Sequence, residues 1–325
     1  MVAGIARLDG RAIRVGLDVG GTKTDAVAID HSGEILGRVR RPTGWGADAV
    51  VRGILDTTFA LAEESGFAAA DIRSVGVGIP GMVDSETGRV LHAVNLGVES
   101  LDIAERARGV IDAPFAVEND VKAAALGAAS LRPDEASMAY LNLGTGVAAG
   151  VITDGRIWRG RHGSAGEVGH ISVDPHGRVC GCGQRGCVET LCGGGALARA
   201  WGRPGELPVL DIFDAAEAGD PVAAGLRADL ARGAAAAVRI LVLSVDVETV
   251  VIGGGLTALG ERLQRDLEQA LRADAENSAF MRSLHLDERI ELLPTGSPVA
   301  ALGAALLDAA PAECPIPVKE TAAHG

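Results

Sequence analysis

The same succession of strands and glycine-rich turns occurs twice in this chain, and this repetition constrains the fold more than any other feature. Strand-like runs are expected at residues 14–19, 24–29 and 34–40 of the first half, and at residues 138–143, 147–153 and 156–159 of the second. A turn of glycine and threonine follows the first run of each set, at Gly20-Gly21-Thr22 and at Gly144-Thr145-Gly146. Three strands joined by tight turns, found twice, predict a duplicated α/β unit.

Helical and strand-like segments follow each set of strands. They are a helix at 48–64, a strand at 74–79, a helix at 101–109, a strand at 115–118 and an alanine-rich helix at 121–130, and then helices from about 196 to 243 and a strand at 249–252. Strands that alternate with helices predict sheets covered on both faces. The 325 residues are enough for two such domains, which we place at residues 1–119 and 120–297.

Composition narrows the possible partners. Hydrophobic residues make up 47% of the chain but aromatic residues only 3%, so the core is expected to consist of Ala, Val, Leu and Ile. The formal net charge of −13 opposes binding to nucleic acid, because phosphate backbones are bound by clustered Lys and Arg. The chain has neither a signal-peptide pattern nor an apolar run long enough to span a membrane, so a cytoplasmic protein with no membrane partner is expected.

The two glycine and threonine turns are candidate phosphate sites. The stretch GLDVGGTKT is close to a P-loop, but here Gly-Thr-Lys opens a strand instead of a helix. Backbone amides and hydroxyls in such turns can still hold phosphate oxygens, and a carboxylate at the preceding strand end can hold Mg²⁺. The residues expected at the phosphates are Asp18, Gly20, Gly21, Thr22, Lys23, Gly144, Thr145 and Gly146. Alternatively, each turn is only a hairpin connection.

A third glycine-rich turn follows the strand at 249–252. Gly253, Gly255 and Ala258 fit a loose form of the dinucleotide-binding fingerprint, but that motif normally lies in the first βα unit of a fold. We interpret Gly254 and Gly255 as part of a glycine-lined surface for the adenine or ribose of a nucleotide.

Asp120 is the candidate catalytic residue. It lies where the strand at 115–118 gives way to a helix, and open α/β sheets bind their ligands at such strand ends. A carboxylate there can accept a proton from a substrate hydroxyl. The alternative is structural, since either Asn119 or Asp120 could simply cap the helix.

Four of the five cysteines lie between residues 180 and 192. Cys180, Cys182 and Cys187, together with His170, supply the Cys₃His ligand set of a closed structural zinc site. The glycines between these cysteines let the chain bend around one ion. Redox pairing is less favoured because Cys-x-x-Cys is absent, and Cys192 and Cys314 are interpreted as small apolar residues.

These motifs together resemble the ROK family of bacterial sugar kinases and sugar-responsive repressors. The resemblance is carried by DVGGTKT, the END turn, LGTG, GSAGEVGH followed by CGCGQRGCVE, and VVIGGG, and it extends from about Arg14 to about Leu307. It implies an actin-like ATPase fold of two α/β domains around a cleft in which ATP and a hexose meet. It also implies a C-terminal helix, at about 298–308, that completes the N-terminal domain, and a homo-oligomer, either a dimer or a tetramer.

The resemblance also assigns residues. Those implied to bind the sugar are Gly81, Asn95, Asn119, Asp120, Glu167, His170 and Glu189. Asp120 matches the family's catalytic carboxylate, and the zinc is implied to fix the loop that carries Glu167 and Glu189. The family often has a tryptophan shortly after the Asn-Leu of Asn95, where this chain has Gly97-Val98-Glu99.

The expected activity is ATP-dependent phosphorylation of a glucose-like hexose, at its 6-hydroxyl. The alternative acceptor is an amino or N-acetylated hexose, such as N-acetylglucosamine, N-acetylmannosamine or an aminoglucose. A sugar-sensing regulator would carry a helix-turn-helix segment before the first glycine-rich turn, but only 17 residues precede Asp18. A nonenzymatic sugar-binding protein would lack the phosphate turns or Asp120, and both are present.

Overall fold

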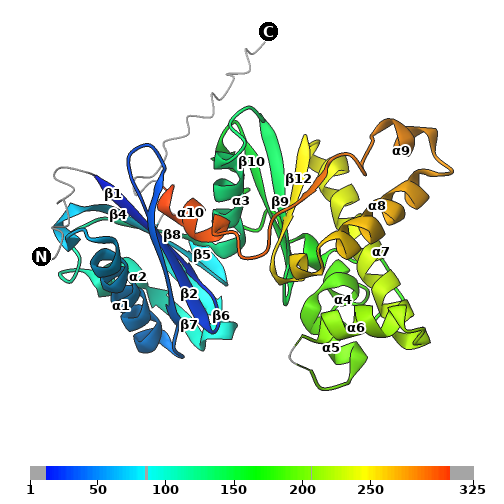
Figure 1. Cartoon of the computed structure of the whole chain (residues 1–325), viewed down its shortest axis with the longest axis horizontal. Helices are drawn as coiled ribbons and strands as arrows, with labels where there is room; N and C mark the ends of the chain where they lie inside the picture. The colour runs from blue at the N-terminus through cyan, green and yellow to red at the C-terminus, as the bar shows by residue number, and fades with distance from the viewer. Residues whose placement is uncertain (1–11, 85–86, 206, 308–325) are drawn as a thin grey trace, which may run out of the picture.

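The computed structural model describes residues 12–84, 87–205 and 207–307 (Figure 1). Residues 1–11 of the expected N-terminal domain, residue 308 of the expected closing helix and Cys314 lie outside the described residues. Within the described ranges, no helix has both the length and the apolar composition needed to cross a membrane.

The first half is built on a five-stranded sheet in the order β3-β2-β1-β4-β8. The strands are β1 (Ile13–Val19), β2 (Lys23–Ile29), β3 (Ile35–Pro42), β4 (Ile72–Ile79) and β8 (Phe115–Asn119). The first three are antiparallel, whereas β4 and β8 continue the sheet parallel to β1. Helix α1 (Ala47–Ser65) buries its apolar side against this sheet, and the short helix α2 (Ile103–Ala107) lies beside it.

The second half repeats this arrangement in the order β11-β10-β9-β12-β13. Its strands are β9 (Ser137–Leu143), β10 (Val147–Thr153), β11 (Arg156–Ile157), β12 (Thr249–Gly253) and β13 (Ile290–Leu292). Again the first three are antiparallel, and the last two run parallel to β9. The same order and directions in both sheets confirm the duplicated α/β unit predicted from the turns.

Helices of the second half enclose the larger of the two main cores. They are α4 (Val188–Cys192), α5 (Gly194–Trp201), α6 (Pro208–Glu217), α7 (Pro221–Val245), α8 (Glu261–Ala275) and α9 (Ala279–Ser283). Helix α3 (Asp120–Ser130) packs instead in a smaller core with Met138, Tyr140, Ile152 and Val251. The longest, α7, starts at a favourable sequence: Asp220 accepts hydrogen bonds from Val222 N (2.9 Å) and Ala223 N (3.1 Å), and Pro221 occupies the first helical position. Single 3₁₀ turns are η1 (Ala69–Asp71), η2 (Val94–Leu96), η3 (Val168–His170) and η4 (Gly255–Leu259).

A small three-stranded sheet in the first half was not predicted. It consists of β5 (Met82–Asp84), β6 (Arg89–Ala93) and β7 (Val98–Asp102). The helix expected at 101–109 is therefore shorter than predicted, because Leu101 lies in β7, where it pairs with Val90 of β6, and the helix begins only at Ile103. Asp102 sets that start, since its side chain accepts a 2.8 Å hydrogen bond from Glu105 N.

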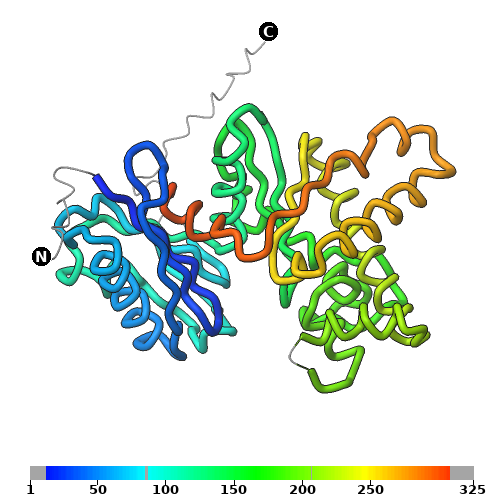
Figure 2. The backbone as a smooth tube through the Cα atoms, in the orientation of Figure 1, coloured from blue at the N-terminus to red at the C-terminus, as the bar shows by residue number. Residues whose placement is uncertain are grey.

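The last described helix, α10 (Val299–Ala305), returns from the second half to the first (Figure 2). Ala301, Leu302 and Ala305 form a small core with Val27 and Ile29 of β2. Helix α10 also lies directly against β1 and α3, and glycines in these two elements permit the close approach. A Cβ at Gly16 of β1 or at Gly127 of α3 would overlap backbone atoms of α10.

Candidate functional site

A pocket of about 240 Å³ lies where the two halves meet. Asp18 lines it from the end of β1, and Asp120 from the start of α3. The other wall comes from β9 and the turn after β12, and includes Tyr140, Asn142, Gly253, Gly254, Gly255 and Thr257. The structure thus brings Gly254 and Gly255, predicted to face a nucleotide, to the same pocket as the two predicted functional carboxylates.

The environment of the two carboxylates raises both of their pKa values. Burial is the largest cause for Asp18, and the negative charges of Asp120 and Asp25 add to it, which raises the pKa of Asp18 to about 7. Burial also raises the pKa of Asp120, with a further contribution from Glu167. Concentrated negative charge of this kind is costly unless a cation joins it, and perturbed carboxylates in a cleft are typical of functional sites.

Asn119 and Asp120 have separate structural roles. Asn119 is the N-cap of α3, because its Oδ1 accepts hydrogen bonds from Val121 N (3.1 Å) and Lys122 N (3.3 Å). The side chain of Asn119 also donates to the Gly81 carbonyl oxygen (3.3 Å), which places two predicted sugar-binding residues in contact. Asp120 follows the cap and accepts a 2.9 Å hydrogen bond from Val121 N, but the N-cap itself is Asn119, so α3 does not depend on Asp120 for capping.

The first glycine turn is a hairpin that lies beside Asn95. Gly20 N donates to Lys23 O (2.9 Å), and β2 begins at Lys23, as expected from Gly-Thr-Lys opening a strand. A Cβ at Gly21 would lie 3.1 Å from Asn95 O, so the predicted phosphate turn and the predicted sugar contact are neighbours. The hairpin interpretation is therefore correct for the backbone, and phosphate binding stays a prediction.

The second glycine turn is held by the start of α5 and by Glu189 of α4. Gly194 N donates to Gly144 O (2.8 Å) and Gly195 N donates to Thr145 O (2.9 Å). Oε2 of Glu189 accepts a 3.0 Å hydrogen bond from Val147 N, immediately after the turn. Glu189, predicted to bind the sugar, thus also connects α4 to this turn, a link for which the sequence offers no signal.

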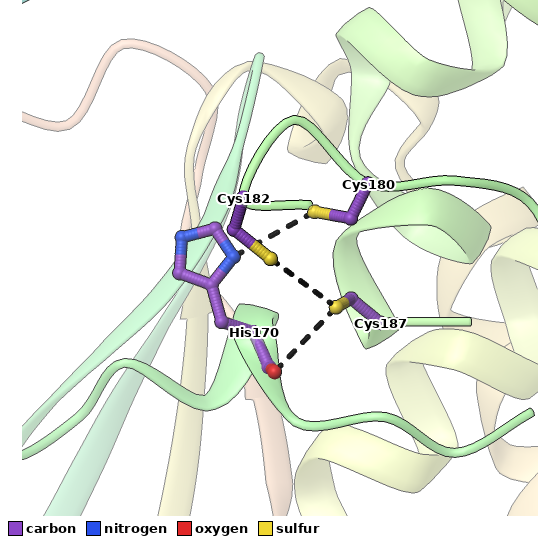
Figure 3. A group of neighbouring side chains, drawn as sticks. All are labelled: His170, Cys180, Cys182 and Cys187. Carbon is purple, nitrogen blue, oxygen red and sulfur yellow. Dashed lines mark hydrogen bonds between the residues drawn. The ribbon is translucent and has the colours of Figure 1, made fainter. Parts of the chain in front are cut away.

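His170, Cys180, Cys182 and Cys187 point toward one another (Figure 3). The Cys180 Sγ to His170 Nδ1 and the Cys182 Sγ to Cys187 Sγ distances are both 3.7 Å, and the four donor atoms lie within 4.8 Å of one another. The edges of a tetrahedral Cys₃His zinc site measure roughly 3.6–3.8 Å from zinc–ligand bonds of about 2.0–2.3 Å. The cluster therefore has the donor set and dimensions to hold a tetrahedral metal ion.

The thiols of this cluster differ in their protonation. Hydrogen bonds from Gln184 lower the pKa of Cys182 to about 6, whereas burial raises the pKa of Cys187 to about 12. A metal would displace the proton from the buried thiol, since thiolates are the ligating form.

The cluster connects the two glutamates of the predicted sugar site. His170 ends η3, which begins directly after Glu167, and Cys187 precedes α4, which carries Glu189 in its first turn. The loop itself has tight backbone pairing: Val173 N donates to Gly186 O (2.8 Å), and Cys180 N donates to Gln184 O (2.8 Å).

Two contacts near Asp120 have no signature in the sequence. Arg159 Nε donates to Glu118 Oε2 (2.6 Å) and Lys122 Nζ donates to the Gly163 carbonyl oxygen, so the loop that leads to Glu167 is held against the region of Asp120. The two partners of each pair are 41 residues apart in the sequence, so no local sequence pattern indicates the contact.

A charged cluster next to Asp18 was also missed. Asp25, opposite Asp18 in the β1–β2 register, accepts hydrogen bonds from Arg38 Nε (2.9 Å) and Arg40 Nη2 (2.6 Å). Arg38 Nη1 also donates to Gly296 O (3.0 Å) at the pocket edge. The alternation Arg38-Val39-Arg40 places both cations on one face of β3, and this signal could have been found in the sequence.

The chain is similar to proteins of known type over most of its length. The ROK family profile matches residues 14–309. A glucokinase of Halalkalibacterium halodurans is 31% identical over 80% of this chain and 86% of its own, and an N-acetylmannosamine kinase of Yersinia pseudotuberculosis is 31% identical over 74% and 82%. The crystal structure of a ROK family glucokinase from Streptomyces griseus, in complex with glucose and AMPPNP, covers 90% of this chain and 98% of its own with a TM-score of 0.72 and 30% identity.

The two duplicated sheets and the pocket between them define an α/β protein of the actin-like ATPase fold, as these relatives have it. Because the family profile spans nearly the whole chain, the protein belongs to the ROK family. The resemblance stated from the motifs is confirmed, and so is its implied fold class.

Proposed function

We propose that this protein transfers the γ-phosphoryl group of ATP to a hydroxyl of a hexose, with a glucose-like sugar as the first candidate. The observation that carries the proposal is the pair of partly buried carboxylates, Asp18 and Asp120, in one pocket between the two sheets. The family relatives named glucokinase support it. We further infer that residues 1–119, completed by α10, and residues 120–297 act as two domains that close over the substrates.

Asp120 would orient the sugar hydroxyl and receive its proton. A sugar hydroxyl is far less acidic than a carboxylic acid, so full deprotonation before attack is unnecessary and unfavourable. In a loose phosphoryl-transfer transition state the proton leaves late, toward a positioned carboxylate. The raised pKa of Asp120 makes it a better proton acceptor than an exposed aspartate, provided that it is ionised when substrate binds.

The phosphates would lie between the two glycine turns, near Asp18. We infer that Asp18 holds Mg²⁺ directly or through water, and that the ion would neutralise charge on the phosphates. The negative environment that raises the pKa of Asp18 fits this role, because a divalent cation there would lower the mutual repulsion of Asp18, Asp25 and Asp120. Gly254 and Gly255 would face the nucleoside.

We propose that zinc occupies the Cys₃His cluster, where it would position neighbouring residues without taking part in phosphoryl transfer. Bound zinc would fix the ends of η3 and α4, and with them Glu167 and Glu189. Glu167 would contact sugar hydroxyls near Asp120, whose pKa it raises. Glu189 would act from the second glycine turn, where it accepts from Val147 N.

An amino or N-acetylated hexose is the second candidate acceptor. The N-acetylmannosamine kinase relative is as similar to this chain, at 31% identity, as the glucokinase of H. halodurans. The acceptor is therefore best identified by ATP-dependent assays over glucose, mannose, fructose, N-acetylglucosamine, N-acetylmannosamine and an aminoglucose.

The test of the mechanism is Asp120→Asn. The amide keeps the size of the side chain and can accept from Val121 N, and the cap of α3 is provided by Asn119, so the fold is expected to persist. Loss of a general base typically costs roughly 10²- to 10⁴-fold in rate, so we expect kcat to fall at least about 100-fold while sugar binding remains measurable. The variant's Tm and zinc content serve as controls. A variant that keeps most of its kcat would exclude Asp120 as the base.

A further inference from the structure

Trp45 is the most exposed large aromatic side chain among the described residues. It lies in the connection between β3 and α1, and 69% of its surface is accessible. Exposure alone means little, because single exposed apolar residues are common on protein surfaces. What distinguishes Trp45 is the loop that holds it and the residues that lie next to its indole ring.

Three backbone and hydroxyl contacts fix the loop that presents Trp45. On one side, Thr43 N donates to Thr22 O (3.2 Å) and the hydroxyls of Thr24 and Thr43 lie 2.9 Å apart. On the other side, Gly46 N donates to Leu96 O (2.8 Å). The loop therefore joins the first glycine turn to the turn that contains Asn95, and Trp45 stands between these two attachments.

The backbone around Trp45 is shaped for this placement. Gly44 and Gly46, on either side, have φ of 85° and 87°, which residues with a Cβ rarely adopt. The indole packs against Gly97, where a Cβ would lie only 2.5 Å from Trp45 Cε2. Because Gly97 has no side chain, one part of the ring rests on the backbone of the Asn95 turn and the remainder faces outward.

We propose that the exposed part of Trp45 is an aromatic platform for the acceptor sugar. A pyranose ring presents apolar C–H groups on its faces and hydroxyls at its rim. An aromatic side chain can cover such a face while neighbouring polar groups bind the rim, the usual division of work in small-molecule sites. Here the neighbouring polar group is Asn95, and Gly21 of the predicted phosphate turn adjoins it. Trp45 thus selects acceptors with an unobstructed C–H face, an inference that rests on the proposed hexose kinase function.

The experiment compares Trp45→Ala and Trp45→Phe with a matched control, Phe280→Ala. Phe280 is 62% exposed, similar to Trp45, but lies in α9 at the far end of the second half (Figure 1). We expect Trp45→Ala to raise the sugar KM at least about 10-fold, the equivalent of roughly 1.4 kcal/mol, with the ATP KM little changed. Trp45→Phe should recover most of the affinity, and Phe280→Ala should leave both constants unchanged.

Tryptophan fluorescence gives a second readout that requires no turnover. The chain has three tryptophans, and Trp201 is buried. Sugar added without ATP should change the emission of the wild type, and Trp45→Phe should remove most of that change while sugar still binds. An unchanged sugar KM in Trp45→Ala would overturn the platform, as would equal increases in the sugar and ATP KM.

The outcomes also separate the platform from the proposed kinase activity. If the wild type binds a sugar with a Trp45-dependent emission change but phosphorylates none, the kinase proposal fails and the platform stands. If the wild type is an active kinase and Trp45→Ala changes only its oligomeric state, the platform fails and Trp45 belongs to a subunit interface. If no sugar binds at all, both are wrong.

Discussion

Replacing Asp18 by Asn should stabilise the protein at neutral and alkaline pH. The folded-state pKa of Asp18 is raised from 3.8 to about 7, so the folded protein binds this proton more tightly than the unfolded chain does. The resulting penalty is absent below about pH 4, grows as the pH rises, and is complete above about pH 7. A shift of about 3 pKa units corresponds to roughly 4 kcal/mol as an upper limit, which for a chain of this size is a Tm shift of at most about 6 °C.

The assay is thermal unfolding of wild type and Asp18→Asn from pH 4 to pH 8.5, in buffer without Mg²⁺ so that no added cation neutralises the site. The two proteins should have similar Tm at pH 4, and the variant should gain steadily through pH 7. Asp25→Asn is the matched control, because Asp25 is the register partner of Asp18 but has the opposite shift. Burial acts to raise the pKa of Asp25, yet hydrogen bonds from Arg38 and Arg40 outweigh it and lower that pKa.

Asp25→Asn should therefore be less stable than wild type throughout the range from pH 4 to pH 8.5, because the lowered pKa of Asp25 keeps its carboxylate ionised and paired with Arg38 and Arg40 over that whole range. If Asp18→Asn shows no pH-dependent gain, or if both variants shift in the same direction, the electrostatic account of the pocket is wrong.

Two further predictions concern the metal and α10. The purified protein should contain about one zinc per chain, and Cys182→Ser should lose most of it, because a Cys₃His set has no spare ligand; metal analysis that finds equal zinc in both proteins would contradict the site. Gly303→Ala should destabilise by roughly 1–3 kcal/mol despite the better helix propensity of alanine, because the new Cβ would overlap the Ala123 carbonyl oxygen of α3. Gly225→Ala in α7, where a Cβ meets nothing within 4 Å, should instead stabilise by up to about 1 kcal/mol in the same denaturation assay.

Local patterns predicted much of this fold because its strands are joined by short turns. Gly-Thr-Lys opening a strand, a capped helix start at Asn119 or Asp120 and the strand at 249–252 are all decided by neighbouring residues; the structure has all three, with Asn119 as the cap. The small β5–β7 sheet was missed because its strands are short, and Leu101 fits a helical pattern as well as a strand. The Cys₃His cluster could be predicted because thiolates and imidazole at that spacing have few other uses.

Contacts between distant segments could not be predicted from single motifs. Two examples are the hydrogen bond from Val147 N to Glu189 and the contact of Trp45 with Gly97. Both depend on how separate turns are brought together in the fold. The raised pKa of Asp18 likewise arises from burial and from Asp120, which is about a hundred residues away in the sequence. The motifs gave the identity of the charged groups, and only the packed structure gives their mutual distances and therefore their electrostatics.

The return of α10 to the first sheet has a consequence for synthesis on the ribosome. Val27 and Ile29 are covered by Ala301, Leu302 and Ala305, so this side of the sheet stays uncovered until roughly 270 more residues have been made. At about 5–20 residues per second, that interval lasts roughly 15–50 s. During this time the nascent first half exposes an apolar strand face, the kind of surface that chaperones bind in unfinished sheets.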